Sequence, residues 1–252
     1  MMGVAAGLAA AGMLPFASSF AMFATGRAYE QVRNSIGYPH LNVKIGGSHA
    51  GISVGEDGAT HQCCEDIALM RTIPGMTVVN PADYYEMKAA VKAIAAYNGP
   101  VYVRLGRLAI ETINDESYQF ELGKGVTLRD GKDITIVATG LMVAEAMEAG
   151  KMLEEKGIDA RIINIHTIKP LDEQLVCKAA QETGKIITVE EHSVIGGLGD
   201  AVCAAVNAGS NGCQVVKMGV HDVYGHSGPG GDLITEFGLR AANIVEEALK
   251  ML

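Results

Sequence analysis

The sequence predicts an α/β protein of two domains, each built on a parallel sheet. Segments with the pattern of a buried strand alternate with segments of helical periodicity, first over residues 1–108 and again over residues 122–252. Between them, residues 109–121 lose that periodicity and collect Thr, Asn, Asp, Glu and Ser, which is typical of a linker. The chain of 252 residues is long enough for two domains, and its 31 glycines suit helices packed closely on a sheet.

Residues 1–13 predict a helix made mostly of small residues, and no charged side chain precedes Arg27. Such a run can signal a membrane span or a secretory signal. Pro15, the lack of a basic flank and the polar Ser18 and Thr25 favour instead a helix packed inside a protein. Because no capping residue stands before this helix, we expect it to be cut from a longer segment.

The rest of the first domain should alternate strands with helices. Short apolar runs end in turn residues such as Asn80-Pro81, which is typical of buried strands. Asp83 can cap the helix that follows, because its side chain accepts a hydrogen bond from a free backbone N–H. The predicted strands are 12–16, 41–45, 78–79 and 101–104, and the predicted helices are 27–36 and 84–97.

The second domain continues the same alternation. Asp172, which follows Pro170, is typical of a helix start. The predicted strands are 134–138, 160–165 and 186–190, with one helix running up to residue 156 and another beginning at residue 172.

Charge and cysteine content limit the partners of this chain. The net charge is −9, with 29 acidic against 20 basic residues, so we expect no nucleic-acid partner and no membrane partner. The five cysteines include no Cys-x-x-Cys pair and are odd in number. A reducing, cytoplasmic location is therefore favoured over a disulfide framework.

The densest group of polar side chains lies in the loop from Ser48 to Gln62, between a predicted strand and a helix. In open α/β sheets, ligands bind at the carboxyl ends of strands, and glycines in this loop permit turns that larger residues resist. His49 and His61 stand too far apart for one helical face, so we expect no metal site. Proton transfer and hydrogen bonding to substrate hydroxyls suit these imidazoles better. A flexible surface loop is the plainer alternative.

This loop resembles the substrate-binding loop of transketolases, and the resemblance extends over essentially the whole chain. It implies a thiamine-diphosphate pyrimidine-binding fold over residues 1–108, a linker over 109–121, and a transketolase C-terminal domain fold over 122–252. The matching runs are Pro15–Phe23, Val43–Gly51, Gly55–Gln62, Leu69–Pro74, Asn80–Asp83, Gly99–Arg107, Ile165–Asp172 and Val189–Gly199.

By this resemblance, two aromatic residues of the first domain bind the cofactor. Phe20 and Phe23 match residues that form an apolar slot for the aminopyrimidine ring, which gains from stacking against flat faces. Gly26 stands where many members carry a third aromatic residue, so we expect the slot to be more open here than in those members. Without the resemblance, Phe20 and Phe23 are equally well explained as core residues one helical turn apart.

The resemblance also implies the residues that meet the substrate. His49 and His61 match imidazoles that contact the reacting carbon and the hydroxyls of the sugar, and they are the expected catalytic residues. Asp57 matches an acid that recognises a sugar hydroxyl, and Arg107 matches the arginine that binds the sugar phosphate. Arg104 is the alternative phosphate ligand, because strand alternation decides which of the two arginines faces the site. A surface salt bridge is the plainer interpretation of either arginine.

The implied reaction moves a two-carbon ketol unit from a ketose phosphate to an aldose phosphate, and thiamine diphosphate carries the hard chemistry. In relatives, the glutamate that activates the cofactor lies just before the segment that begins here at Met1. The diphosphate and its magnesium ion lie on another domain. We therefore expect the C-terminal subunit of a split transketolase, inactive without an N-terminal diphosphate-binding subunit, in a homodimer or a heterotetramer.

Other interpretations stay open. 1-Deoxyxylulose-5-phosphate synthase and the β subunit of 2-oxoacid dehydrogenases share both domains, although synthases usually carry an arginine where His49 stands. A non-catalytic assembly module is a further alternative. The glycines at 196–199 lack the spacing of a dinucleotide-binding loop. Glu191, His192 and His226 are expected to be hydrogen-bonded loop residues rather than catalysts.

Overall fold

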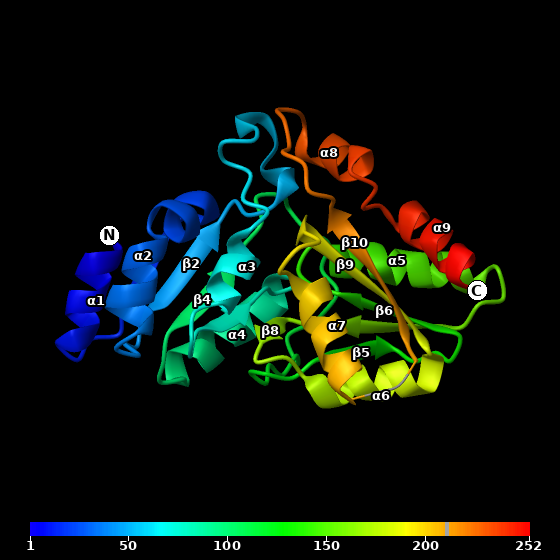
Figure 1. Ribbon diagram of the computed structural model, residues 1–252, viewed down its shortest axis with the longest axis horizontal. Coiled ribbons are helices and arrows are strands. Elements are labelled where there is room, and N and C mark those ends of the chain that lie inside the picture. Colours follow the sequence, from blue (N-terminus) through cyan, green and yellow to red (C-terminus); the bar gives the residue numbers. More distant parts are fainter. Residues whose placement is uncertain (210–211) are drawn as a thin grey trace.

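Two five-stranded sheets lie side by side in the computed structural model, which describes residues 1–209 and 212–252 (Figure 1). The first sheet has the strand order β1-β2-β4-β3-β8, and the second has the order β10-β9-β6-β7-β5. Helices pack against both sheets, which confirms the predicted α/β class.

The first sheet takes four of its strands from the N-terminal half of the chain. Its strands are β1 Phe16–Phe20, β2 Lys44–Ser48, β3 Thr77–Val79, β4 Val101–Arg104 and β8 Thr167–Lys169. The helical segments of this half are α1 Met2–Ala10, the π-helical turns η1 Met22–Arg27 and η2 Val32–Gly37, α2 Tyr29–Gln31, the 3-10 turn η3 Ile52–Asp57, α3 Asp66–Arg71 and α4 Tyr84–Ala96.

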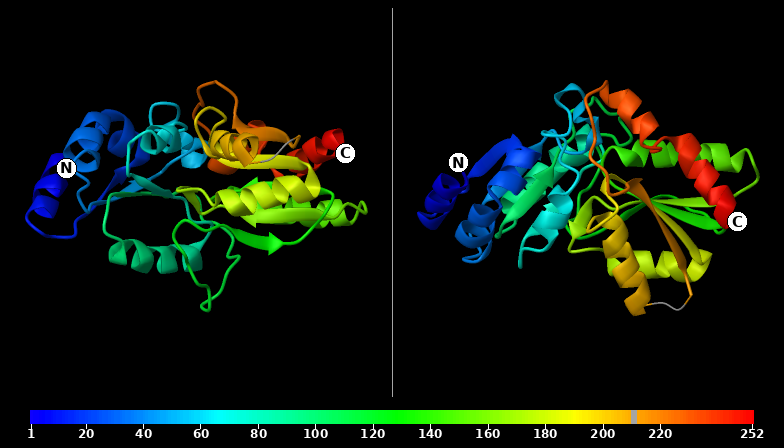
Figure 2. Two further views of the ribbon diagram at one scale, coloured as in Figure 1. Left: turned by 60° about the horizontal axis from the view of Figure 1, so that its bottom comes forward. Right: turned by 45° about the horizontal axis from the view of Figure 1, so that its top comes forward.

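The second sheet lies between two pairs of helices. Its strands are β5 Val126–Arg129, β6 Ile134–Ala138, β7 Ala160–Asn164, β9 Lys185–Ser193 and β10 Gln214–Val220. The helices are α5 Met142–Glu154, α6 Glu173–Thr183, α7 Leu198–Gly209, α8 Gly230–Glu236 and α9 Ala241–Met251. Figures 1 and 2 show α5 and α9 on one face of this sheet and α6 and α7 on the other.

Parallel pairing holds inside both sheets, and one antiparallel pair lies at an edge of each. β8 pairs antiparallel with β3, where Thr167 lies opposite Val79, and β5 pairs antiparallel with β7. The sequence predicted neither edge strand. β8 contains a single apolar residue, Ile168, and β5 has no buried residue, so neither forms the continuous apolar run that marks a buried strand.

β2 begins at Lys44 and ends at Ser48, whereas the predicted strand was 41–45. The later end arises because the strand includes Gly46 and Gly47. Glycine lowers strand propensity, so the sequence pattern stopped at Ile45. Packing requires a glycine at position 47, since an added Cβ would lie 2.2 Å from the Tyr102 hydroxyl oxygen.

The first strand and the first long helical segment also differ from prediction. The sequence predicted the first strand at 12–16, but β1 begins at Phe16, after Pro15. The strand starts later because Gly12, with a φ of 89°, turns the chain at the end of α1. Helical structure then starts at Met22, before the predicted helix 27–36. A strand end followed at once by a π-helical turn leaves no periodic pattern in the sequence.

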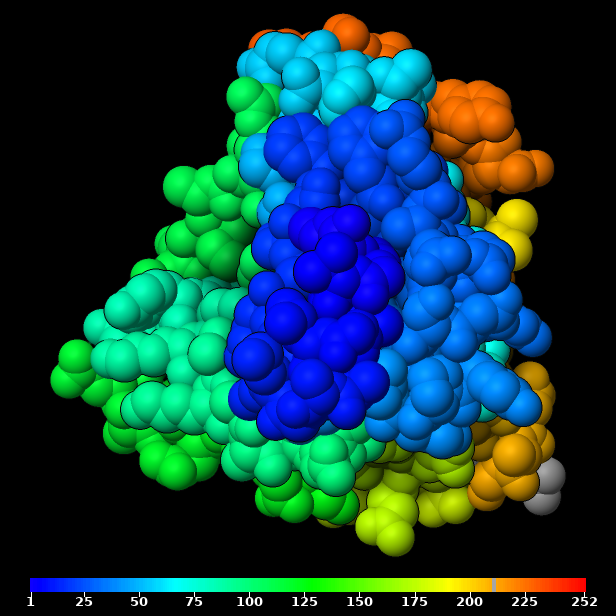
Figure 3. Space-filling model, turned by 90° about the vertical axis from the view of Figure 1, so that its left-hand side faces the viewer, coloured from blue at the N-terminus to red at the C-terminus, as the bar shows by residue number. Residues whose placement is uncertain are grey.

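α1 lies at one flank of the molecule, where Figure 3 shows it in dark blue across the middle of the face. Met2 and Ala5 are buried, whereas Val4 and Leu8 are 68% and 40% exposed. The prediction of a helix packed inside the protein therefore holds for one face of α1 only. Every helix among the described residues is too short or too polar to span a membrane.

Two predicted helix caps are confirmed. Asp83 Oδ1 accepts a hydrogen bond from the Glu86 N–H at 2.8 Å at the start of α4. Asp172 Oδ1 accepts one from the Leu175 N–H at 3.1 Å at the start of α6. Each carboxylate satisfies a backbone donor that the first turn of a helix leaves free.

One hydrophobic cluster crosses between the two halves of the chain. It includes Val78 and Tyr102 from the first sheet and Ile165, Ile168 and Val176 from the second half. Val137 and Ile163 of the second sheet belong to the same cluster, so the two sheets share a common apolar core.

Candidate functional site

Four rings gather at the carboxyl ends of β1 and β2, and we name them the aromatic cluster: Phe20, Phe23, His49 and His61. The Phe20 and His49 rings stack with their centroids 4.0 Å apart. The Phe23 ring lies 6.1 Å from that of Phe20 and meets the His61 ring edge to face at 5.2 Å. All four side chains are partly exposed, so the cluster presents aromatic surface to solvent.

Strand register and loop closure bring the aromatic cluster together. Phe20 pairs with Ser48 in the parallel register of β1 and β2, so both strands end at the same level. His49 then adopts a left-handed backbone conformation with a φ of 56°, which turns the chain out of the sheet. A parallel bridge between Ala50 and Cys63 returns the end of the loop to its start.

Neighbouring hydroxyl groups orient both imidazoles. Ser48 Oγ lies 3.2 Å from His49 Nδ1, and Thr60 Oγ1 lies 2.9 Å from His61 Nδ1. Within the part of the chain that the structure describes, neither Nε2 atom makes a hydrogen bond. This nitrogen of each ring is therefore available to a ligand.

Arg107 lies at the exposed edge of the same loop. Its guanidinium pairs with the Glu56 carboxylate and donates to the Val54 carbonyl oxygen at 2.6 Å. The Glu56 pairing raises the pKa of Arg107, and the negative charge of Asp57 adds to this effect. A bond from its own backbone N–H and the bond from Arg107 lower the pKa of Glu56. Asp57 is exposed beside this ion pair.

Arg104 faces the interior and is only 3% exposed. Its Nε donates to Asp66 Oδ2 at 2.9 Å, and its Nη2 donates to the Glu191 carbonyl oxygen at 2.7 Å. Burial alone would lower the pKa of Arg104, but Asp66 and Glu191 outweigh it and raise the pKa above its usual value. Of the two arginines that the sequence left open, Arg107 is the one that solvent and ligands can reach.

The second half of the chain supports this loop through contacts that the sequence did not predict. Gln62 Nε2 donates to the Ile52 carbonyl at 3.0 Å and to the His226 carbonyl at 2.9 Å. The Ser53 N–H donates to Glu191 Oε1 at 2.5 Å. In addition, η3 of this loop contacts α8, and Figure 1 shows the two at the top of the molecule. No local pattern marks these pairs, because the partners lie 164 and 138 residues away.

His226 is a hydrogen-bonded loop residue, as predicted. Glu191 and His192 also make hydrogen bonds, but they lie in a strand and not in a loop, because β9 continues to Ser193, past the predicted end at residue 190. His192 is buried, and its Nε2 accepts from the Ala68 N–H at 3.3 Å. His226 Nε2 lies 2.9 Å from Glu236 Oε1, and this contact raises the pKa of His226.

The described residues offer no group of three or more His, Cys, Asp or Glu side chains that could hold a metal ion. The five cysteines are free. Burial raises the pKa of Cys63, and it raises that of Cys64 to about 12. Thiols with such raised pKa values are poor nucleophiles near neutral pH, so neither cysteine of the loop has the properties of a catalytic thiol.

Family models match nearly the whole chain. Residues 1–112 match the transketolase pyrimidine binding domain, and residues 123–244 match the transketolase C-terminal domain. A protein described as a transketolase C-terminal section, from Methanocaldococcus jannaschii, is 50% identical over 252 residues, which cover 99% of this chain and 79% of that protein. The chain belongs to the transketolase family.

Other relatives of this transketolase-family chain carry out more than one reaction. A subunit of a 6-deoxy-6-sulfo-D-fructose transketolase from Clostridium sp. strain MSTE9 is 48% identical over 98% of this chain and 77% of that protein. A 1-deoxy-D-xylulose-5-phosphate synthase from Heliobacterium modesticaldum is 36% identical over 98% of this chain, but the match covers 38% of the synthase. Membership of the family therefore fixes neither the particular reaction nor the substrate of this chain.

A solved structure described as a split gene transketolase, in an inactive β4 tetramer, is similar over nearly the whole chain. It is 50% identical with a TM-score of 0.93, and the match covers 99% of this transketolase-family chain and 80% of that one. The transketolase of Campylobacter jejuni matches with a TM-score of 0.82 at 22% identity, over 99% of this chain and 38% of that one. At that identity the likeness concerns the fold alone.

Proposed function

We propose that this chain is the C-terminal subunit of a split transketolase, which uses thiamine diphosphate to transfer a two-carbon ketol unit from a ketose phosphate to an aldose phosphate. The observation that carries this proposal is the aromatic cluster, which lies at the strand ends where α/β sheets bind ligands. Residues 1–108 then act as the pyrimidine-binding domain and 122–252 as the C-terminal domain, joined by 109–121. Its free cysteines support a cytoplasmic location.

In this proposal, Phe20 and Phe23 bind the pyrimidine ring of the cofactor. Their rings are partly exposed and nearly parallel, with an interplanar angle of 16°, and a flat heteroaromatic ring gains from contact with such a surface. When bound, thiamine diphosphate supplies the electron-accepting ring that two-carbon transfer requires. The diphosphate and its magnesium ion are assigned to the N-terminal partner subunit.

His49 and His61 hold the sugar and move its protons. An imidazole donates or accepts a proton near neutral pH, and the hydroxyl contacts at each Nδ1 leave each Nε2 to face a substrate hydroxyl. Asp57, exposed at the end of η3, can accept a hydrogen bond from a further hydroxyl.

Arg107 binds the phosphate group of the sugar. Its guanidinium already pairs with a carboxylate, Glu56, so an anionic partner suits the position. A phosphate can replace that carboxylate through charge-assisted hydrogen bonds, since both partners are exposed at the edge of the loop.

Reconstitution tests this function. The chain, an N-terminal diphosphate-binding transketolase subunit, thiamine diphosphate and magnesium should together transfer the ketol unit between a ketose phosphate and an aldose phosphate. We expect neither subunit to be active alone, and light scattering should show a homodimer of this chain or a heterotetramer with its partner. Ketol transfer by this chain in the absence of any partner subunit would contradict the proposal.

Two further experiments distinguish a split transketolase from a synthase and from a non-catalytic assembly module. The complex given pyruvate and glyceraldehyde phosphate should leave the pyruvate unconsumed, whereas a synthase would consume it. A titration with thiamine diphosphate should change the near-ultraviolet circular dichroism of the complex. A complex that shows neither cofactor binding nor ketol transfer would favour a non-catalytic assembly module.

A further inference from the structure

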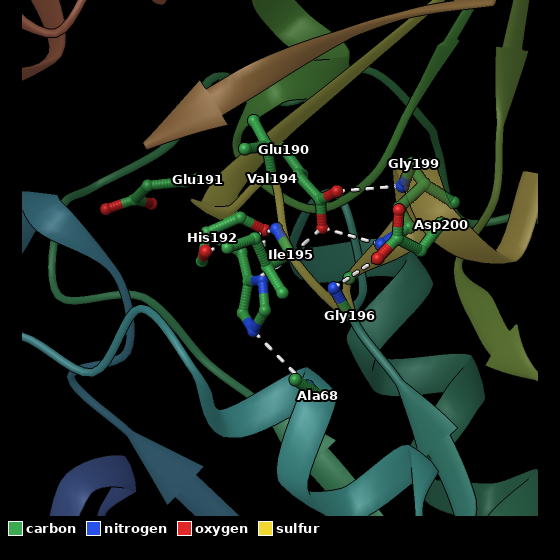
Figure 4. Close-up of polar contacts among 12 residues, drawn as sticks. Ala68, Glu190, Glu191, His192, Val194, Ile195, Gly196, Gly199 and Asp200 are labelled. Atoms are coloured by element: carbon green, nitrogen blue, oxygen red, sulfur yellow. Dashed lines mark hydrogen bonds and ion pairs between the residues drawn. The ribbon is translucent and has the colours of Figure 1, made fainter. Parts of the chain in front are cut away.

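Glu191 is a buried residue of the second sheet whose carboxylate contacts the loop from Ser48 to Gln62 of the first domain. We name this segment the substrate loop. Glu191 lies near the end of β9 and is 3% exposed. Its neighbours Glu190 and His192 lie on the opposite face of the strand, as the two-residue period of a strand requires. Figure 4 shows the Glu191 carboxylate pointing away from both of them.

The Glu191 carboxylate packs directly against the backbone of the loop. Its Oε1 accepts a hydrogen bond from the Ser53 N–H at 2.5 Å. Gly51, with a φ of 87°, lies so close that an added Cβ would be 2.4 Å from Glu191 Cδ. These two contacts follow His49 in the chain, so they fix the backbone immediately after the first histidine of the site.

The backbone of Glu191 is itself held by the first domain. Arg104 Nη2 donates to its carbonyl oxygen at 2.7 Å, and Arg104 is anchored in turn by Asp66 Oδ2 at 2.9 Å. The Tyr102 hydroxyl donates to the same Asp66 oxygen at 2.7 Å. All these side chains are buried, so this chain of contacts holds Glu191 in one place relative to β4 and the loop.

We propose that Glu191 is a positioning residue, through which the C-terminal domain sets the conformation of the loop that carries His49, Asp57 and His61. This inference rests on the proposed function for its effect on turnover, but the placement of the loop is independent of that function. The buried carboxylate fills the space beside Gly51 and satisfies the Ser53 N–H, which would otherwise be a buried donor without a partner.

Glu190 provides a matched control. It is buried in the same strand, but its carboxylate accepts hydrogen bonds from the Leu198 and Gly199 N–H groups at the start of α7, at 2.7 and 2.8 Å. Figure 4 shows the Gly199 contact. Loss of either carboxylate should weaken the fold, whereas only the loss of Glu191 should disturb the substrate loop.

The test compares Glu191→Leu with Glu190→Leu in the complex with the N-terminal subunit. We expect Glu191→Leu to lower kcat/KM by about 100-fold, since misplaced catalytic groups cost that much, and to increase amide hydrogen exchange over residues 49–57. Glu190→Leu should keep the kcat/KM of the parent and increase exchange over residues 196–200 instead. Glu191→Gln, which keeps the acceptor for Ser53, should restore most of the turnover and of the exchange protection.

The outcomes are separable. Parental exchange over residues 49–57 in Glu191→Leu, or an equal fall in kcat/KM in both Leu variants, would overturn the positioning role. If Glu191→Leu does not fold, Glu191→Asp takes its place in the comparison with Glu190→Leu. Its shorter side chain moves the hydrogen-bond acceptor away from the Ser53 N–H. If the parent complex shows no ketol transfer, the proposed function fails, and the exchange measurement alone still decides whether Glu191 positions the loop.

Discussion

At the scale of single residues, His49 and His61 leave the same ring nitrogen, Nε2, without a hydrogen bond among the described residues. A hydroxyl group lies against the Nδ1 of each ring, from Ser48 for His49 and from Thr60 for His61. Fixing one nitrogen orients the other, which is how enzymes prepare an imidazole for proton transfer. The aromatic cluster limits the rotation of both rings further, since each packs against a phenylalanine.

The His61→Ala substitution should therefore reduce turnover much more than stability. We expect kcat in the reconstituted complex to fall by about 100-fold or more, as is usual when a general acid or base is lost. The free energy of unfolding should change by no more than about 1 kcal/mol, because His61 is partly exposed. His221→Ala, at an exposed histidine outside the cluster, is the control. Unchanged kinetics in His61→Ala would make His61 a structural residue.

Arg104 and Arg107 show which features of the candidate site a sequence can predict. Both are visible as candidate phosphate ligands, and strand alternation was expected to choose between them. β4 ends at Arg104, so Arg107 lies beyond the strand and the alternation does not reach it. Burial of Arg104 depends on Asp66 and Glu191, which come from other elements and leave no mark in the local sequence.

At the scale of secondary-structure elements, Asp83 joins a helix start to the segment between the two sheets. Its Oδ1 caps α4 through the Glu86 N–H. Its Oδ2 accepts from the Ile113 N–H at 2.8 Å and from the Asn114 N–H at 2.6 Å. The predicted cap thus has a second role, because it also fastens residues of the predicted linker to α4.

Asp83 should make stability depend on pH. Burial opposes its charged form, but the hydrogen bonds from Glu86, Asn114 and Ile113 outweigh burial and lower the pKa of Asp83 below 3.8. Because the folded-state pKa is depressed, the stabilisation is present above about pH 4 and is lost as the pH falls through the lower folded value.

The matching variant is Asp83→Asn, which cannot titrate at this position. We expect it to be less stable than the parent by about 1–2 kcal/mol at pH 7, as for the loss of a cap and its charged acceptor. The difference should be smaller at pH 3, because the depressed pKa makes the parent lose this stabilisation as the pH falls below about 4. Urea unfolding at both pH values measures this. A difference of equal size at pH 7 and pH 3 would contradict the assigned titration.

The sequence predicted the bounds of a strand correctly where a continuous apolar run lies between turn residues. The strands Val101–Arg104 and Ile134–Ala138 have their predicted bounds, because each is a continuous buried run between turn residues. The end of β2 was predicted too early because the strand contains Gly46 and Gly47, and the need for glycine at position 47 comes from Tyr102 on another strand. β8 was missed because Ile168 is its single apolar residue, and only its pairing with β3 makes it a strand.

At the scale of the whole molecule, the two sheets are linked by more than the connecting segment. β8 follows β7 in the chain but pairs with β3 of the first sheet. Asn164 Nδ2, at the end of β7, donates to Glu86 Oε1 of α4 at 2.9 Å. Since the common apolar core also includes Ile168 of β8, the sheets should not unfold independently.

The last prediction concerns this cooperativity. Ile168→Ala, at a side chain that is 1% exposed, should lower the free energy of unfolding by about 2–5 kcal/mol, as for other large-to-small changes in a core. We expect amide hydrogen exchange to show the same loss of global protection in β2 and in β6, although Ile168 belongs to the first sheet only. Leu249→Ala, at a side chain 47% exposed on α9, should leave both unchanged. Loss of protection in β2 with parental protection in β6 would show that the two sheets unfold as separate units.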